Sequence, residues 1–398
     1  MSLARNIDFL RRLPKLNGLR FAETARGADQ HSPLAEITGF GTNPGNLRMF
    51  AFVPAQLQQP RALVVVLHGC GQTAASYDLG AGWSTLARHY GFALLLPEQR
   101  RANNANTCFN WFNPEDTARD SGEARSIREM IAHMASVHGI DARRTFITGL
   151  SAGGGMTSVM LATYPEVFAA GAVIAGLPYG VASNLRQALD GMFYSPERPA
   201  RELGDLVRKA SNHRGPWPKI SVWHGSADRT VNPGNADEIV KQWLDLHELP
   251  LTPMAETVVD GYPRQAWWNA DGETIVESFA ITDMAHGTPL GVADNDHRYG
   301  MEGAFLIEAG ISSSYHIAKF FDLTDWIRSS APAKKPAPAL SPAPHLARSI
   351  RVAVAEPQAN AKPKSKPGAK PKTKRGLDLG GIITRALTAA GLMKSSGP

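Results

Sequence analysis

The chain has 398 residues, of which 43% are hydrophobic and 20% are charged, a composition typical of a globular enzyme with one large or two small domains. No apolar run approaches the roughly 20 residues of a membrane-spanning helix, so no transmembrane segment is expected. The formal net charge is +6 and it is unevenly distributed. Residues 331–398 carry 13 Lys and Arg against two acids, a net charge of +11, which leaves −5 for the rest.

The first 45 residues predict one short amphipathic helix followed by a loop. Residues 2–13 bring Ile7, Leu10 and Leu13 near one helical face, and Pro14 would end the helix. The segment lacks the apolar run of about 7–15 residues that a secretory signal needs. We therefore expect a cytoplasmic protein, unless an export signal was lost or is unconventional.

Residues 46–330 alternate between strand and helix patterns. Short apolar, β-branched runs suit strands buried on both faces, and longer segments with apolar spacings of three and four suit helices. The predicted strands are 63–67, 93–96, 145–148, 169–175, 220–223 and 274–281, and the predicted helices are 83–90, 121–138, 153–164, 233–247 and 317–327. This alternation predicts one α/β domain, with a mostly parallel central sheet covered by helices on both faces. The stretches 103–120 and 177–218 interrupt it and are expected to be loops over a functional site.

The composition changes after residue 330. Residues 331–376 are rich in Ala, Pro and Lys and contain no Phe, Trp or Tyr, which predicts a disordered linker. Residues 377–398 predict a short amphipathic helix that three glycines weaken, so it would fold only on a partner. This basic tail either binds an anionic surface or a polymer granule, or stays solvated. Without aromatic residues to stack on bases, it is not expected to bind a specific nucleic acid.

A glycine-rich turn carries the first chemical motif. Gly149-Leu150-Ser151-Ala152-Gly153 matches the pattern G-x-S-x-G and lies between a predicted strand and a predicted helix. In that context the pattern is typical of the nucleophile elbow of the α/β-hydrolase fold. The tight turn strains the backbone of Ser151 and projects its hydroxyl above the sheet, near a helix N-terminus that favours negative charge. A turn without chemistry is the alternative.

A serine hydroxyl is a weak nucleophile and needs a base. In the α/β-hydrolase fold the acid and then the histidine follow the serine along the chain. Asp228 follows predicted strand 220–223 and His286 follows predicted strand 274–281. We predict that Ser151 attacks an ester carbonyl, that His286 takes its proton, and that Asp228 orients the imidazole. His224 is interpreted as a structural histidine at a strand end, and Asp283 is the rival acid.

The tetrahedral intermediate of such a reaction needs N–H donors. We predict the amides of Ala152 and of Cys70, which follows the first buried strand, as these donors. Gly71 and Gln72 of the same loop, and Trp111 in stretch 103–120, are predicted to bind substrate; for Trp111, buried aromatic packing is the alternative.

The paired tryptophans Trp267 and Trp268 either line the same pocket or pack in the core. The sequence has no metal-ligand cluster of recognisable spacing and no nucleotide-binding loop, so neither a metal nor a cofactor is expected. The two cysteines, Cys70 and Cys108, could pair, although two cysteines do not make a disulfide scaffold.

Together these motifs resemble the polyhydroxybutyrate depolymerase family of esterases, which includes feruloyl and acetylxylan esterases of similar architecture. The resemblance spans about residues 46–328 and is carried by Leu67-His68-Gly69-Cys70, Cys108-Phe109-Asn110-Trp111-Phe112, Gly149-Leu150-Ser151-Ala152-Gly153-Gly154, His224-Gly225-Ser226-Ala227-Asp228 and His286-Gly287. It implies that Ser151, Asp228 and His286 form the catalytic triad. It also implies a Cys70–Cys108 disulfide, as in similar exported enzymes, and an extracellular location as the alternative to the cytoplasm.

The resemblance implies a serine esterase that works through an acyl-enzyme, on short hydroxyacyl esters or oligomers of the polyhydroxybutyrate type. Feruloyl or acetylxylan-type esters are the alternative substrates, and a peptidase on the same fold is a further one. Family members that degrade solid polymer look like exported enzymes with a separate substrate-binding domain, which this sequence does not show. A hypothesis of another class is a binding protein that holds a polymer granule or an anionic surface through its basic tail.

Overall fold

The computed structural model describes residues 32–55, 57, 60 and 62–324. All of them belong to one of the two compact units of the chain, residues 15–330. The predicted N-terminal helix, the predicted linker 331–376 and the predicted helix within 377–398 lie outside the described residues, and so does the proposed binding surface of the tail. Within the described part, no helix is long and apolar enough to cross a bilayer.

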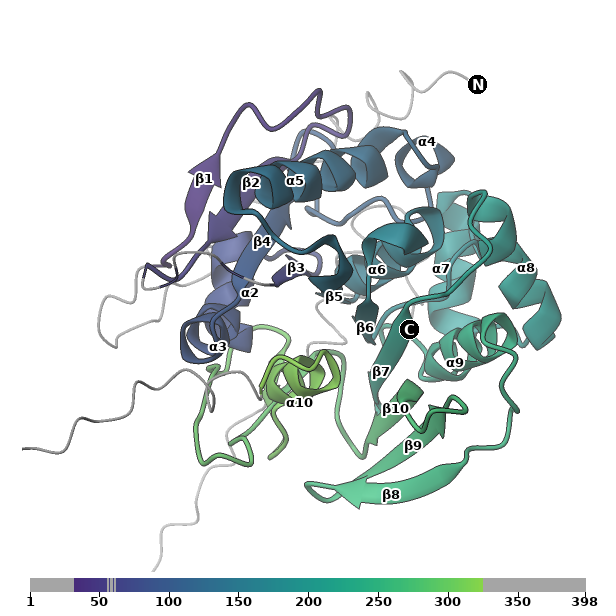
Figure 1. Cartoon of the computed structure of the whole chain (residues 1–398). Coiled ribbons are helices and arrows are strands. Elements are labelled where there is room, and N and C mark those ends of the chain that lie inside the picture. The colour runs from purple at the N-terminus through teal and green to yellow at the C-terminus, as the bar shows by residue number, and fades with distance from the viewer. Residues whose placement is uncertain (1–31, 56, 58–59, 61, 325–398) are drawn as a thin grey trace, which may run out of the picture. The chain divides into compact units, whose positions relative to one another are not determined.

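A ten-stranded sheet organises the described residues (Figure 1). In spatial order its strands are β1 (Ala35–Ile37), β2 (Arg48–Phe52), β4 (Ala93–Glu98), β3 (Leu63–Leu67), β5 (Thr145–Leu150), β6 (Ala170–Ile174), β7 (Lys219–Gly225), β10 (Thr274–Ile281), β9 (Tyr262–Trp268) and β8 (Ala255–Val259). The strands from β4 to β10 in this order pair in parallel, and the two outer strands on each side pair antiparallel. The predicted mostly parallel α/β sheet is confirmed.

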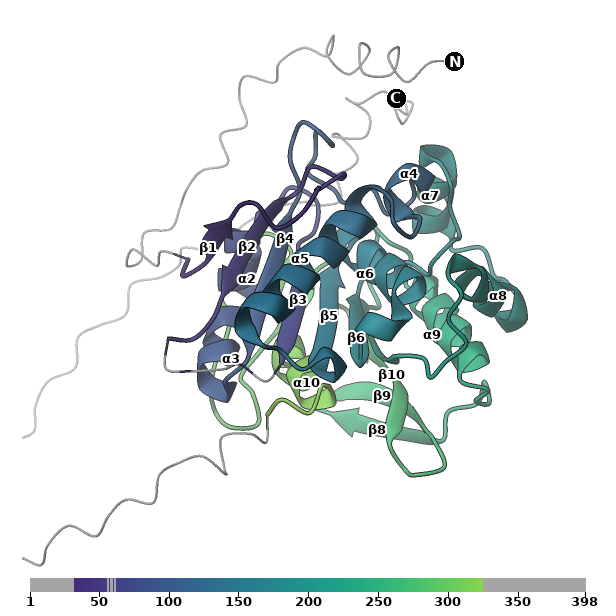
Figure 2. The same ribbon diagram turned by 45° about the horizontal axis from the view of Figure 1, so that its top comes forward.

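Helices cover both faces of the sheet. Alternate side chains of β3 point to opposite faces: Leu63, Val65 and Leu67 belong to one core, and Val64 and Val66 belong to the other. The first core is closed by α5 (Gly122–His138), α6 (Ala152–Thr163), α7 (Leu185–Tyr194), α8 (Ala200–Ala210) and α9 (Gly234–Leu246), and the second by α2 (Ala74–Ala81), α3 (Trp83–Tyr90) and α10 (Ser313–Phe320). Figure 2 looks onto the first face, with α5 and α6 in front of β3 and β5.

The structure corrects several predicted elements. The last described helix spans Ser313–Phe320, whereas the sequence pattern predicted residues 317–327. The stretches 103–120 and 177–218 were expected to be loops, but the first contains α4 (Pro114–Thr117) and the second contains α7 and α8. The four antiparallel strands were not predicted, because they are short or carry exposed polar residues that weaken the apolar pattern.

The parallel strands bring distant loops to one edge. The carboxyl ends of β3, β5, β7 and β10 lead into the loops that begin at His68, Ser151, Ser226 and Thr282. Ligand sites of open α/β sheets form at this edge, where strand ends leave side chains and backbone amides uncovered. A small parallel pair, β11 (Thr288–Leu290) and β12 (Leu306–Glu308), continues the chain beyond β10.

Candidate active site

Ser151 occupies a strained turn between β5 and α6. Its backbone has φ +58° and ψ −118°, a region that a residue with a side chain rarely adopts. The turn is held because the Ser151 N–H donates to the carbonyl of Ile174 at 2.9 Å, at the end of the neighbouring strand β6. The strained conformation is therefore set by the sheet, and it presents the serine side chain at the carboxyl edge.

The glycines on either side of the serine are required by close backbone packing. A Cβ atom at Gly153 would lie 2.6 Å from the carbonyl oxygen of His68, and one at Gly149 would lie 2.5 Å from the carbonyl carbon of Gly153. Neither contact can be relieved by a side-chain rotation, because the clashing atoms belong to the backbone. The two glycines of the motif are therefore needed because the start of α6 packs closely against the ends of β3 and β5.

His286 lies between the serine and an acid. Its Nε2 atom is 2.9 Å from Ser151 Oγ, and its Nδ1 atom is 2.6 Å from Asp228 Oδ2. A carboxylate oxygen accepts, so Nδ1 carries the proton and Nε2 is left to accept from the serine hydroxyl. Only 7% of the His286 residue surface is exposed, and Phe305 packs edge-on against the ring. The imidazole is oriented to take the proton of Ser151.

The carboxylate of Asp228 is buried and accepts four N–H groups. Oδ1 accepts from the amides of Thr230 at 2.8 Å and Val231 at 3.0 Å. Oδ2 lies 2.6 Å from His286 Nδ1 and 3.1 Å from His224 Nε2. Burial alone would raise the pKa of Asp228, but the hydrogen bonds from His224 and His286 outweigh it and hold the pKa well below its usual range. The acid is therefore ionised wherever the protein is folded at ordinary pH.

His224 is the residue of this site that the sequence pattern did not single out. It was interpreted as a structural histidine at a strand end, and the structure places it near the end of β7 with its ring against the Asp228 carboxylate. The four-residue spacing in His224-Gly225-Ser226-Ala227-Asp228 was the available signal. The rival acid Asp283 is exposed, and its backbone amide donates to Ser226 Oγ at 2.9 Å. The carboxylate that pairs with His286 is that of Asp228.

The loop after β3 has one amide left for a ligand. Gly69 donates to Gln72 Oε1 at 2.9 Å, Gly71 donates to Asn106 O at 2.8 Å, and the Gln72 amide approaches Gly69 O at 3.3 Å. The amide of Cys70 has no partner among the described residues. The same is true of Ala152 at the start of α6, where helix geometry leaves the first N–H groups unpaired. These two amides remain able to bind an oxyanion.

The predicted substrate contacts of this loop stay predictions, because the observed contacts of the residues are internal. The Gln72 side chain accepts from Gly69 and donates to Ala304 O at 3.0 Å, which ties the loop to the segment before β12. Cys70 and Cys108 form a disulfide that joins the loop to residues 99–112. Trp111 in that segment is buried and packs on Gly155, four residues after Ser151.

Trp267 and Trp268 lie away from this edge. In β9 they pair with Val276 and Thr274, at the beginning of β10, and Val276 is in register with Ile220 near the beginning of β7. The two tryptophans therefore lie near the end of the sheet opposite to Ser151, which favours packing, the alternative interpretation. Trp267 is buried in the core, and its indole N–H donates to the carbonyl of Thr252 at 3.0 Å.

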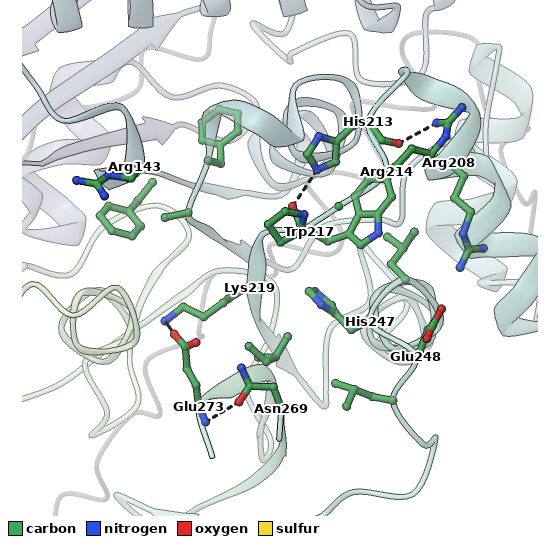
Figure 3. A pocket seen from close by; sticks show the side chains of 18 of the residues that line it. Arg143, Arg208, His213, Arg214, Trp217, Lys219, His247, Glu248, Asn269 and Glu273 are labelled. Atoms are coloured by element: carbon green, nitrogen blue, oxygen red, sulfur yellow. Dashed lines mark hydrogen bonds and ion pairs between the residues drawn. The ribbon is translucent and has the colours of Figure 1, made fainter. Parts of the chain in front are cut away.

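A hollow of about 1200 Å³ opens at the opposite edge of the sheet (Figure 3). Lys219 at the start of β7 lies on its wall, together with Trp217, His213 and His247. Its described lining contains bases and acids but no serine, threonine or cysteine. It therefore lacks a hydroxyl or thiol nucleophile, which leaves the Ser151 edge as the candidate active site.

Comparisons with known proteins show the family of this chain. Residues 49–253, about half of the chain, match the family described as Esterase PHB depolymerase. The poly(3-hydroxyalkanoate) depolymerase C of Paucimonas lemoignei is 44% identical over 291 residues, which cover 73% of this chain and 70% of that protein. The chain belongs to the esterase PHB depolymerase family.

Other relatives of this esterase carry related names. An acetylxylan esterase of Coprinopsis cinerea is 33% identical over 263 residues, covering 64% of the chain and 69% of the relative. A feruloyl esterase B of Thermothelomyces thermophilus is 34% identical over 244 residues, which cover 59% of the chain and 80% of the relative. The solved structure of an acetyl xylan esterase from Aspergillus awamori shares the fold, with a TM-score of 0.61 and 24% identity. The match covers 73% of this chain and 99% of that one.

The family membership makes this esterase a carboxylic ester hydrolase of the serine hydrolase type. The described residues contain no group of three or more His, Cys, Asp and Glu that could hold a metal ion. At the carboxyl edge the structure brings together the Ser151 hydroxyl, the His286 imidazole and the Asp228 carboxylate, beside the two uncommitted amides.

Proposed function

We propose that Ser151, His286 and Asp228 are the catalytic triad of this esterase. The observation that carries the proposal is the continuous chain of hydrogen bonds from Ser151 Oγ through His286 to Asp228, at 2.9 and 2.6 Å. Distances of about 2.6–3.2 Å are what proton transfer between nucleophile and base requires. The buried, ionised acid supports the role of orienting the ring and stabilising its charged form.

The reaction then runs through an acyl-enzyme. Ser151 Oγ attacks the ester carbonyl as His286 Nε2 takes its proton, and the negative oxygen accepts from the amides of Cys70 and Ala152. Collapse of this intermediate breaks the bond to the alcohol, which receives the proton from His286. Water activated by the same imidazole then hydrolyses the acyl-serine and restores the enzyme.

The test is Ser151→Ala assayed on a short-chain p-nitrophenyl ester. Loss of the nucleophile should lower kcat by about 10⁴-fold or more, while the circular dichroism spectrum and thermal unfolding stay those of the wild type. Turnover within tenfold of the wild type would show that Ser151 is not the nucleophile and would overturn the proposal.

We propose short hydroxyacyl esters, or oligomers of the polyhydroxybutyrate type, as the substrate class. The similarity to the poly(3-hydroxyalkanoate) depolymerase C supports this choice, since its identity of 44% exceeds the 33% and 34% of the acetylxylan and feruloyl esterases. Comparing kcat/KM on hydroxybutyrate oligomers, feruloyl esters and acetylated sugars tests it. A preference for either of the last two would move the enzyme to the alternative substrate class.

We also propose that the esterase works in an oxidising compartment, in place of the cytoplasm expected from the sequence. The Cys70–Cys108 disulfide supports this location, because cytosolic thiols are kept reduced. Titration of free thiols in protein purified from its native source without reductant tests the proposal. Two free thiols per chain would contradict the proposal and indicate a reducing compartment.

A further inference from the structure

The Asp228 carboxylate has a second histidine on the oxygen that faces the base. His224 Nε2 is 3.1 Å from Asp228 Oδ2 and 3.0 Å from the carbonyl oxygen of Val231. Both neighbours are acceptors, so Nε2 carries a hydrogen and shares it between them. The other ring nitrogen, Nδ1, is buried and has no hydrogen-bond partner among the described residues. The geometry therefore gives His224 one donor, on Nε2, and no acceptor for a second proton.

This donor competes directly with the base. His286 Nδ1 and His224 Nε2 both point at Oδ2, and the Thr230 and Val231 amides occupy Oδ1. A carboxylate offers about four lone-pair positions, so the acid is fully occupied. Each donor withdraws negative charge from the oxygen that would otherwise stabilise a protonated His286.

We propose that His224 is a positioning residue of the esterase, which fixes the Asp228 carboxylate and sets the pH below which activity is lost. The inference rests on the triad of the proposed function. His224 is buried beneath Asp228, with 4% of its surface exposed, so it acts through the acid and does not touch substrate.

Few other charges reach this cluster. Besides Asp228, Asp237 on α9 interacts electrostatically with His224, and Lys241 on the same helix interacts with Asp237. From the loop after β10, Asp283 is exposed to solvent and its carboxylate is screened. The titratable groups in direct hydrogen-bond contact within the cluster are Asp228 and His286. A change in the pH profile after substitution of His224 is therefore caused by the Oδ2 contact.

The direction of the effect follows from the hydrogen bond. Without the His224 N–H, Oδ2 holds only His286, its charge is less dispersed, and protonated His286 is stabilised. The free enzyme then loses its base at a higher pH, so the acidic limb of kcat/KM moves upward. A shift of about 0.5–1 pH unit is expected, since an N–H dipole acts more weakly than a full charge, which shifts such a group by about 1–3 units.

The experiment compares His224→Met with His224→Gln in the full-length protein. The two side chains have the same length, but only Gln has an Nε2 donor that can reach Oδ2. H224M should raise the acidic limb by about 0.5–1 unit and lower kcat at pH 8 about tenfold, with KM within about twofold. H224Q should keep the wild-type limb. If H224M does not fold, His224→Phe replaces it, because it also lacks a donor.

The matched control is His247→Met, at the opposite edge of the sheet beside the hollow of Figure 3. His247 Nε2 donates to the carbonyl of Pro218 at 3.0 Å and has no contact with the triad. H247M should leave the pH profile and kcat unchanged. The inference would be overturned if the acidic limb of kcat/KM in H224M stayed at the wild-type pH, or if H224Q shifted that limb as much as H224M does. Activity in Ser151→Ala would instead overturn the proposed function beneath it.

Discussion

Gly153 and His68 meet backbone to backbone, where the start of α6 passes the end of β3. A Cβ atom at Gly153 would lie 2.6 Å from the His68 carbonyl oxygen. The contact couples the serine turn to the loop that carries the Cys70 amide. The same close approach therefore brings the proposed nucleophile and both proposed oxyanion donors to one place.

Gly153→Ala should consequently disable the enzyme. The added methyl group must push the helix start away from β3, which separates the Ala152 and Cys70 amides, and loss of one such donor lowers the rate about 10²–10³-fold. Assays of kcat on a p-nitrophenyl ester check this. Gly191→Ala in α7 is the matched control, because its Cβ would lie 3.6 Å from Leu177, an ordinary contact. Equal activity of the two variants would contradict the role of the Gly153 contact.

Removing the disulfide should weaken both stability and catalysis. Cys70 and Cys108 are 38 residues apart, and closing a loop of that length in the unfolded chain contributes about 4 kcal/mol to the free energy of unfolding. The double variant Cys70→Ser with Cys108→Ser should lose about this much in urea unfolding. Its kcat should also fall, since the link between the loop and residues 99–112 would then depend on the hydrogen bonds of the Gly71 amide to Asn106 O and Thr107 Oγ1. Reductant should reproduce both effects in the wild type and add nothing in the variant.

Asp78 should make stability depend on pH. One carboxylate oxygen accepts from the Ser84 amide at 2.7 Å, and the other is buried without a partner among the described residues. Burial raises the pKa of Asp78 from an ordinary 3.8 to about 6. Between these values the folded protein binds more protons than the unfolded chain, so stability falls as pH rises, by up to about 3 kcal/mol.

Asp78→Asn removes this titration but keeps the oxygen that accepts from Ser84. The free energy of unfolding of the variant, measured in urea from pH 4 to pH 7, should rise relative to the wild type across that range. Parallel curves for the two proteins would show that the Asp78 carboxyl does not titrate as described.

Deletion of residues 331–398 should leave ester hydrolysis intact. The segment lies outside the residues that form the site, and it carries a net charge of +11. The shortened protein should keep the wild-type kcat/KM on soluble esters. If the tail binds anionic surfaces, retention on anionic vesicles should be lost and should also decrease with salt in the full-length chain. A loss of activity on soluble substrate would show that the tail is part of the enzyme.

Local sequence patterns sufficed for much of the architecture. The run Leu63–Leu67 is buried at every residue, as its β-branched composition predicts, and helix Trp83–Tyr90 has the predicted bounds. Patterns failed where burial is incomplete. The strand Ala255–Val259 is largely exposed, and the helix from Ser313 begins before the predicted position. A residue on an outer strand takes its conformation from a neighbouring strand, which its own sequence does not specify.

By itself the sequence determined the strand–turn–helix around Ser151, the parallel sheet and the candidate serine, acid and histidine, because each depends on periodicity or on steric limits within a few residues. Only the tertiary structure decided which groups meet. Ser151 and His286 are 135 residues apart and follow strands with β6 and β7 between them in the sheet. Strand order and register set which loop ends share an edge of the sheet. They therefore decide that His224 contacts Asp228, that the Cys70 loop keeps one uncommitted amide, and that Trp267 lies away from the site.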